Sequence, residues 1–351
     1  MKNIFKIVFV IIGTFVGAGF ASGQEVSSFF FKYGKFGLLG IFITTIMLGA
    51  IIYKTLNLIL KNDIKDYKEF LEKIIKNDFL KNIINIIVNI YLIISFYIMI
   101  AGFGAFMNQE YNFQNFLGCT ILATTCFFIL KKNINGLVKI NEALIPVLII
   151  VISLIGFYNI RNFNKGLKIN DIQNNKWILD SILYASYNSI ALIPILISTK
   201  KYVKSSKNIK IISIISMTII LILLINIYFL LFNVDVITQI PSIYAVKKIS
   251  NKLRYIYGVI ILISILTTAI SVGTSFINNV TKSKKVRNYL INFICISSIL
   301  FSNLGFSNLI NIFYPILGTL GLIQIVFIFI PKHKKCVVKN IKKWYNLRYK
   351  I

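Results

Sequence analysis

The chain has 351 residues, of which 57% are hydrophobic, and its mean hydropathy is +0.77. An ordinary soluble domain holds roughly 45–50% apolar residues, so this composition excludes a soluble globular protein. The formal net charge of +28 does not indicate a nucleic-acid partner, because the 39 basic residues lie between apolar stretches and form no separate domain. We therefore expect an all-α integral membrane protein whose main partner is the lipid bilayer.

Apolar runs that are long enough to cross a bilayer recur along the chain. A helix needs about 20 residues to cross a hydrocarbon core of about 30 Å. We predict ten transmembrane helices, at 4–31, 37–60, 83–106, 113–130, 140–160, 178–199, 209–232, 254–278, 288–304 and 308–330. Together they form one polytopic transmembrane domain, residues 1–331, with repeats at about 4–160 and 178–330.

The distribution of lysine and arginine predicts the orientation. Counted from the N-terminal segment, alternate connecting segments hold 29 basic residues and the remaining segments hold 10. Cytoplasmic segments carry the excess of Lys and Arg. We therefore expect a multi-pass protein of the bacterial cell membrane with both termini in the cytoplasm.

Two connecting segments have patterns of their own. Between the second and third spans, apolar residues recur at helical spacing in 64–75 and predict an amphipathic helix along the inner face. Residues 332–351 form a basic tail in which aromatic and lysine residues alternate. This cytoplasmic tail should rest on anionic lipid.

The first span contains glycines at Gly13, Gly17, Gly19 and Gly23. Glycine in a helix interior costs about 1 kcal/mol relative to alanine, so this density favours unwinding. Unwound backbone in a membrane frees carbonyls that can hold a cation and amides that can hold a carboxylate. Close helix packing is the alternative, because both glycine pairs have small-xxx-small spacing.

Glu25 follows this glycine-rich segment, within or at the outer edge of the span. Ionisable groups at membrane depth are costly and usually functional. We interpret Glu25 as a coupling or gate residue that faces the outer vestibule, with a proton or a cation as its ligand. An interfacial charge without a function is the alternative.

The sixth and eighth spans carry polar residues near their centres. In the sixth, polar residues from Tyr184 to Ser189 precede Pro194, which predicts a second interrupted helix. In the eighth, Thr267 and Thr268 are adjacent hydroxyls that suit a hard cation such as Na⁺. Hydrogen bonding of each threonine to its own preceding turn is the alternative.

These features together resemble the LeuT-type fold of the amino acid–polyamine–organocation superfamily. The segment from Gly13 to Glu25 looks most like the YkvI-type bacterial membrane proteins, which are distantly similar to branched-chain amino acid carriers. The resemblance implies a LeuT-like inverted repeat of five plus five helices, with the first and sixth discontinuous.

The resemblance also implies site residues. The sodium site would consist of backbone carbonyls in the first span and oxygens in the eighth: Gly13, Val16, Ser264, Thr267 and Thr268. The substrate site would consist of residues from the first, third and sixth spans: Thr14, Gly17, Ala18, Gly19, Phe20, Tyr97, Tyr184, Ser186, Tyr187 and Asn188.

Two positions depart from the relatives. Some of them place an asparagine ligand for a second sodium where this chain has Phe20, so a second sodium is not expected. The sixth span also lacks the glycines that relatives use for unwinding, and its break would depend on Asn188 and its polar neighbours.

The leading hypothesis is a secondary transporter of an amino acid or a similar small solute, coupled to Na⁺ or H⁺ and needing no other cofactor. A permease-like nutrient sensor of the germination-receptor type, which binds without transport, is the alternative. An enzyme is not expected, because His333 in the tail is the sole histidine and the spans contain no paired carboxylates. A channel would need rings of charge or a carbonyl filter motif, which the sequence does not show.

Overall fold

The computed structural model describes residues 2–132, 137–161, 176–203, 205–234 and 238–330. All regular structure in these ranges is helical. The elements in chain order are α1 (Lys2–Phe15), α2 (Ala18–Ala21), α3 (Gln24–Phe29), η1 (Phe31–Tyr33), α4 (Lys35–Lys61), α5 (Tyr67–Ile74), α6 (Asp78–Tyr111), α7 (Asn115–Lys131), α8 (Leu137–Arg161), α9 (Lys176–Ser198), η2 (Lys200–Tyr202), α10 (Ser206–Leu230), η3 (Leu231–Asn233), α11 (Pro241–Ile249), α12 (Asn251–Val280), α13 (Lys284–Phe301), η4 (Ser302–Leu304) and α14 (Phe306–Phe329).

A helix or a group of helices occupies each of the ten predicted spans. Within the described ranges, six helices are long and apolar enough to cross a bilayer: α4, α6, α9, α10 with η3, α12 and α14. Shorter apolar helices lie at Asn3–Phe15, Asn115–Lys131 and Ile145–Ile160. An all-helical membrane protein is therefore confirmed, while the count of ten crossings and the inverted repeat stay predictions. The predicted basic tail at 332–351 lies outside the described residues.

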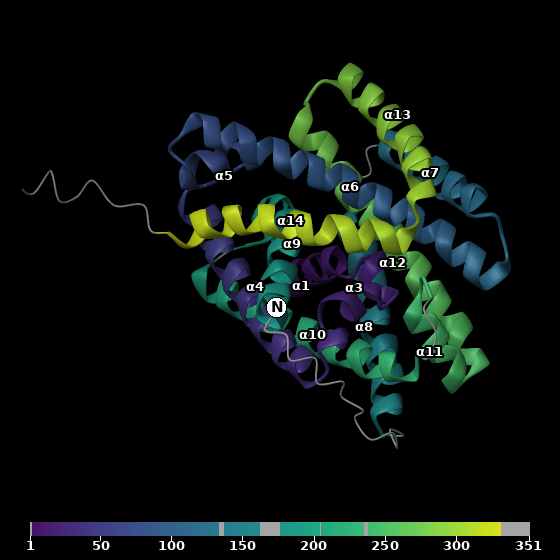
Figure 1. Cartoon of the computed structure of the whole chain (residues 1–351). Coiled ribbons are helices and arrows are strands. Elements are labelled where there is room, and N and C mark those ends of the chain that lie inside the picture. The colour runs from purple at the N-terminus through teal and green to yellow at the C-terminus, as the bar shows by residue number, and fades with distance from the viewer. Residues whose placement is uncertain (1, 133–136, 162–175, 204, 235–237, 331–351) are drawn as a thin grey trace, which may run out of the picture.

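The helices of the first span lie at the centre of the bundle. Helix α1 packs against α8, α9, α10 and α12, and α9 in turn packs against α4 and α14. Figure 1 shows α1 and α3 in the middle of the molecule beside α9, with α14 crossing in front. The first span is therefore enclosed by helices from both halves of the chain.

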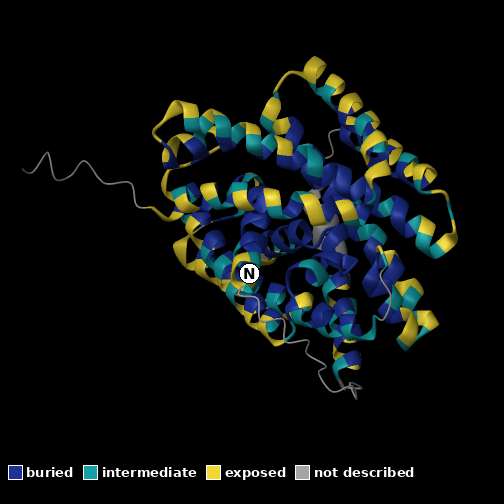
Figure 2. Cartoon of the chain, viewed as in Figure 1, coloured by how far each residue is buried: buried dark blue, intermediate teal, exposed yellow. Residues whose placement is uncertain are grey.

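Burial follows the same plan. Figure 2 shows buried residues gathered around the central helices and exposed residues on the outer flanks. Several of the exposed side chains are large and apolar, including Ile46 at 60% and Leu154 at 65% relative exposure. Such surfaces are expected where a helix faces lipid tails.

Local sequence signals explain several helix boundaries. Helix α5 begins after Asp66, whose side chain accepts a hydrogen bond from the Glu69 amide at 2.9 Å. Helix α6 begins after Asn77, which caps two amides of the first turn. The predicted amphipathic helix after the second span is confirmed in α5, which buries Tyr67, Phe70 and other apolar residues.

Candidate functional site

The glycine-rich first span is interrupted at two points. Helix α1 ends at Phe15, and α2 begins after Gly17, whose backbone is extended at φ −91° and ψ −170°. A second interruption precedes α3, where Gly23 adopts φ +77°, a left-handed conformation that favours glycine. The first of these two interruptions, which we call the span-one break, places free backbone groups at the centre of the bundle.

The span-one break faces the hydroxyl pair of α12. The Thr268 hydroxyl donates to the carbonyl oxygens of Gly13 and Val16, each at 3.3 Å. These contacts join residues that lie more than 250 positions apart, and the Thr268 side chain is buried. Three of the five predicted sodium ligands therefore lie together.

The other two predicted ligands make their hydrogen bonds within α12. The Thr267 hydroxyl donates to the carbonyl oxygen of Ile263 at 2.9 Å and to that of Ser264 at 3.2 Å. This is the back-bonding that the sequence left as the alternative for the pair. The two threonines thus differ, since Thr268 reaches the span-one break and Thr267 bonds its own helix.

Glu25 lies in α3 and is turned into the protein. Its side chain is 3% exposed, and its Oε2 accepts hydrogen bonds from the hydroxyls of Tyr184 at 3.0 Å and Tyr187 at 2.5 Å. Tyr314 of α14 lies beside this pair, with its ring stacked on that of Tyr187 at 4.4 Å between centroids. The predictions that Glu25 faces an outer vestibule or is an interfacial charge are therefore wrong for this structure, because three tyrosines enclose it.

Gly19 explains how Glu25 fits so closely to α2. A Cβ atom added at Gly19 would lie 2.3 Å from Oε1 of Glu25 and 2.8 Å from its Cγ. Real Cβ atoms do not approach other atoms this closely. Glycine at this position therefore leaves the space that the carboxylate occupies.

The predicted substrate residues of the first span line the break but enclose little space. The amide of Ala18 donates to Met99 Sδ at 3.3 Å, and the ring of Phe20 packs on that of Phe15 with 5.2 Å between centroids. Thr14 and Asn188 line a cavity of about 10 Å³. The residues that follow the break are themselves buried, with Ala18 at 1% and Phe20 at 0% relative exposure, so the structure is closed around them.

The predicted discontinuity of the sixth span is wrong. Helix α9 runs without a break from Lys176 to Ser198, although Pro194 lies inside it. Its polar side chains bond to carbonyls of the preceding turn: Ser186 to Ile182 at 2.6 Å and Asn188 to Tyr184 at 2.9 Å. These groups are satisfied within the helix and do not unwind it.

Tyr97 does not face the break, so its predicted role over the substrate is also wrong. Its hydroxyl lies 2.6 Å from Ser297 Oγ, and its ring stacks on Phe301 with centroids 4.9 Å apart. Met99, two residues further along α6, contacts the break instead. Successive helical residues are turned by about 100°, so positions two apart point to nearly opposite sides.

Helices α11 and α12 contact the first span at the second interruption, between α2 and α3. The Ser242 amide donates to the Ser22 carbonyl at 2.9 Å, and the hydroxyls of Ser242 and Tyr257 both donate to the Ala21 carbonyl, at 2.7 Å and 2.8 Å. Ser242 and Tyr257 could not be predicted from the sequence, because each of these side-chain contacts joins segments more than 200 positions apart.

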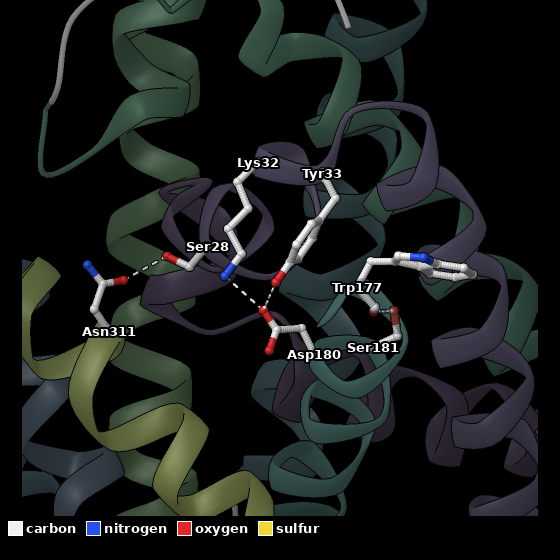
Figure 3. A network of polar contacts seen from close by, with 7 residues as sticks. All are labelled: Ser28, Lys32, Tyr33, Trp177, Asp180, Ser181 and Asn311. Atoms are coloured by element: carbon white, nitrogen blue, oxygen red, sulfur yellow. Dashed lines mark hydrogen bonds and ion pairs between the residues drawn. The ribbon is translucent and has the colours of Figure 1, made fainter. Parts of the chain in front are cut away.

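A second group of contacts joins the end of the first span to α9 and α14 (Figure 3). Lys32 Nζ lies 2.8 Å from Asp180 Oδ2, and the Tyr33 hydroxyl donates to the same oxygen at 2.7 Å. Ser28 donates to Asn311 Oδ1 at 2.7 Å. These contacts hold α3 and η1 to α9 and α14, next to the group formed by Glu25, Tyr184, Tyr187 and Tyr314, which we call the Glu25 cluster.

A larger cavity opens at the opposite end of the bundle. It has a volume of about 390 Å³ and lies among residues of α5, α9 and α12, including Tyr67, Ile195 and Ser271. The Ser271 hydroxyl donates to the Thr267 carbonyl at 2.7 Å. The cavity therefore ends one helical turn from the hydroxyl pair.

The chain is similar to two uncharacterised proteins of Bacillus subtilis along nearly its whole length. It is 25% identical over 330 residues to the uncharacterised membrane protein YkvI of Bacillus subtilis, covering 90% of this chain and 92% of that protein. It is 26% identical over 334 residues to the uncharacterised protein YyaD of the same organism, covering 92% and 94%. No family model matches the chain. The predicted resemblance to YkvI-type proteins is confirmed.

Solved structures share the fold. A manganese transporter from Eremococcus coleocola superposes with a TM-score of 0.64 at 15% identity, covering 92% of this chain and 78% of that one. MhsT in complex with L-phenylalanine gives 0.63 at 15% identity, covering 90% and 87%. Both are LeuT-fold transporters, so the predicted LeuT-type fold is confirmed.

Proposed function

We propose that the chain is a secondary transporter that moves an amino acid or a similar small solute by alternating access, coupled to Na⁺. The observation that carries the proposal is the approach of Thr268 to the carbonyls of Gly13 and Val16. It joins a helix from the second half of the chain to backbone groups that only an interrupted first span leaves free.

The chemistry of this contact suits sodium. A hard cation prefers oxygen ligands, and the break supplies two carbonyls while α12 supplies one hydroxyl oxygen, without a carboxylate. The Thr268 hydroxyl donates hydrogen bonds to both carbonyls. A bound Na⁺ would lie between the same oxygens, and rotation of the hydroxyl would turn a lone pair toward the ion. Such a neutral site should bind weakly, as a coupling ion requires.

The surroundings of the break suit a small solute with an apolar side chain. The Ala18 amide donates to a thioether sulfur, which is a weak hydrogen-bond acceptor. A substrate carboxylate in its place would accept a stronger hydrogen bond. The rings of Phe15, Phe20 and Tyr184 lie beside it, with centroid separations of 5.2 Å and 5.9 Å. The bound L-phenylalanine of MhsT is consistent with this chemistry.

The burial of the substrate region and the position of the larger cavity fit one state of an alternating-access cycle. Ala18 and Phe20 are buried, Ser242 and Tyr257 bond to the Ala21 carbonyl on one side, and the cavity of about 390 Å³ lies at the other end. The predicted orientation makes that end cytoplasmic. The arrangement corresponds to a form closed to the outside, from which a solute would leave to the inside.

Uptake by proteoliposomes tests the proposal. Radiolabelled amino acids would be offered with an inward Na⁺ gradient, with a K⁺ gradient as reference. We expect Na⁺-stimulated uptake that Thr268→Ala abolishes and Thr124→Ala preserves, because the exposed Thr124 hydroxyl bonds only within α7. Saturable binding of an amino acid without uptake would instead support a nutrient sensor.

A further inference from the structure

The carboxylate of Glu25 is buried among neutral groups. The described titratable side chains around it are tyrosines: Tyr184 and Tyr187 from α9 donate to its Oε2, and Tyr314 from α14 and Tyr91 from α6 lie nearby. Among the residues that the structure describes, no lysine or arginine forms an ion pair with it. A negative charge in this position has no opposite charge to compensate for the loss of water.

The packing around the carboxylate leaves no room for a bulky cation. Gly19 lies against Oε1, while Oε2 accepts both hydroxyls from α9. The tyrosine rings are themselves fixed by neighbours, since Tyr187 stacks on Tyr314 with centroids 4.4 Å apart and Tyr184 packs edge-on to Phe30 at 4.8 Å. A proton is the one cation that needs no additional space.

We propose that Glu25 and its tyrosines form a proton-binding gate, in which a protonated Glu25 holds the outer half of the first span closed against α9 and α14. The proton comes from water when α3 separates from the two helices, and it binds a carboxylate oxygen as the cluster closes. Loss of the proton leaves a buried charge that favours separation and contact with water. This gate rests on the proposed transport function and gives it a second coupling ion, H⁺, beside Na⁺.

The contacts that α3 and η1 make next to the Glu25 cluster support a gate that moves as one unit. Ser28 and Lys32 on the same segment bind Asn311 of α14 and Asp180 of α9. These two helices also carry Tyr184, Tyr187 and Tyr314. Figure 3 shows these side chains meeting between the end of the first span and its partners. Ser28–Asn311 is an exposed contact and the Lys32 side chain is about half exposed, so both pairs contribute little to the stability of the closed form. The buried carboxylate of Glu25 and its tyrosines are therefore the part of the interface that protonation can switch.

Infrared difference spectroscopy of the full chain in lipid tests the proton site directly. We expect a carbonyl-stretch band of a buried, protonated carboxyl at pH 6, where exposed glutamates with a pKa of about 4.3 are ionised. The band should disappear at higher pH, be absent from Glu25→Gln, and persist in Glu72→Gln, which removes an exposed carboxylate of α5. Tyr187→Phe should shift its frequency, because one hydrogen bond is lost.

A reporter cysteine tests the gate. In a background without the native cysteines, Ser22→Cys replaces a side chain that is 1% exposed. Its rate of alkylation, divided by the rate for the same cysteine in Glu25→Gln, should rise as the pH rises. A constant ratio, or an infrared band that Glu25→Gln retains, would overturn the proposal. Neither measurement requires uptake, so a titrating band in a protein that transports nothing would refute the transport function and leave the proton site standing.

Discussion

Replacing Gly19 with alanine tests the Glu25 cluster by its packing. The added Cβ would lie 2.3 Å from Oε1, 2.8 Å from Cγ and 2.9 Å from Cδ of Glu25, so the carboxylate must move. The tyrosine hydroxyls hold the carboxylate in place, and the displacement therefore strains the cluster. Overpacking of this kind costs about 1–3 kcal/mol, while the helix preference of alanine returns at most about 1 kcal/mol.

A double-mutant cycle isolates this cost. Unfolding of purified Gly19→Ala should occur at lower temperature or denaturant concentration than unfolding of the parent. In a Glu25→Ala background the clash is absent, so the same change should be neutral or stabilising, with an interaction energy of about 1–3 kcal/mol. Gly17→Ala is the matched control, because its nearest neighbours are Thr268 and Met99. Equal costs of Gly19→Ala in both backgrounds would refute the reasoning.

Three further predictions concern other parts of the chain. A topology reporter fused after Ile351 should be active only in the cytoplasm, and activity only outside the cell would reverse the orientation. Asp63, in the segment between α4 and α5, has its pKa lowered by its hydrogen bond and ion pair with Lys200. The small stability from this exposed pair should be present at neutral pH and lost as the pH falls through the lowered pKa. An NMR titration of Asp63 that is unchanged in Lys200→Met would contradict this. Ser242→Ala removes a hydroxyl from the Ala21 carbonyl and should increase the accessibility of the outer side to impermeant thiol reagents, as measured by labelling a cysteine introduced nearby; unchanged labelling would show that Ser242 does not hold the outer side closed.

The helices and the interrupted first span could be predicted because their causes are local. Apolar runs fix the helix positions, and the glycines weaken one particular span. Gly23 shows the reason most clearly, since its φ of +77° is open to glycine and costly for other residues. The approach of Thr268 to the first span could be predicted from the resemblance, whereas the pair of hydroxyls alone left hydrogen bonding within the helix open.

The predictions for the sixth span, Tyr97 and Glu25 were wrong because tertiary burial or the side of a helix that faces its neighbour decides where these side chains lie. A polar run in the sixth span indicated a break, but Ser186 and Asn188 found acceptors in their own helix. The choice of Tyr97 over Met99 depended on which side of α6 faces the first span, and composition does not fix that side. Glu25 lies inward because tyrosines more than 150 positions away enclose it.

Direct binding of radioactive sodium to the purified protein tests the central claim most directly. Because Thr268 reaches the span-one break and Thr267 bonds within α12, the two single alanine variants separate a ligand from a neighbour on the same helix. The account predicts saturable sodium binding that Thr268→Ala abolishes and Thr267→Ala weakens less. It also predicts that sodium and a bound amino acid tighten each other's binding by the same factor, roughly 5–150-fold at a typical coupling energy. Sodium binding that is absent from the parent protein, or undiminished in Thr268→Ala, would contradict the account.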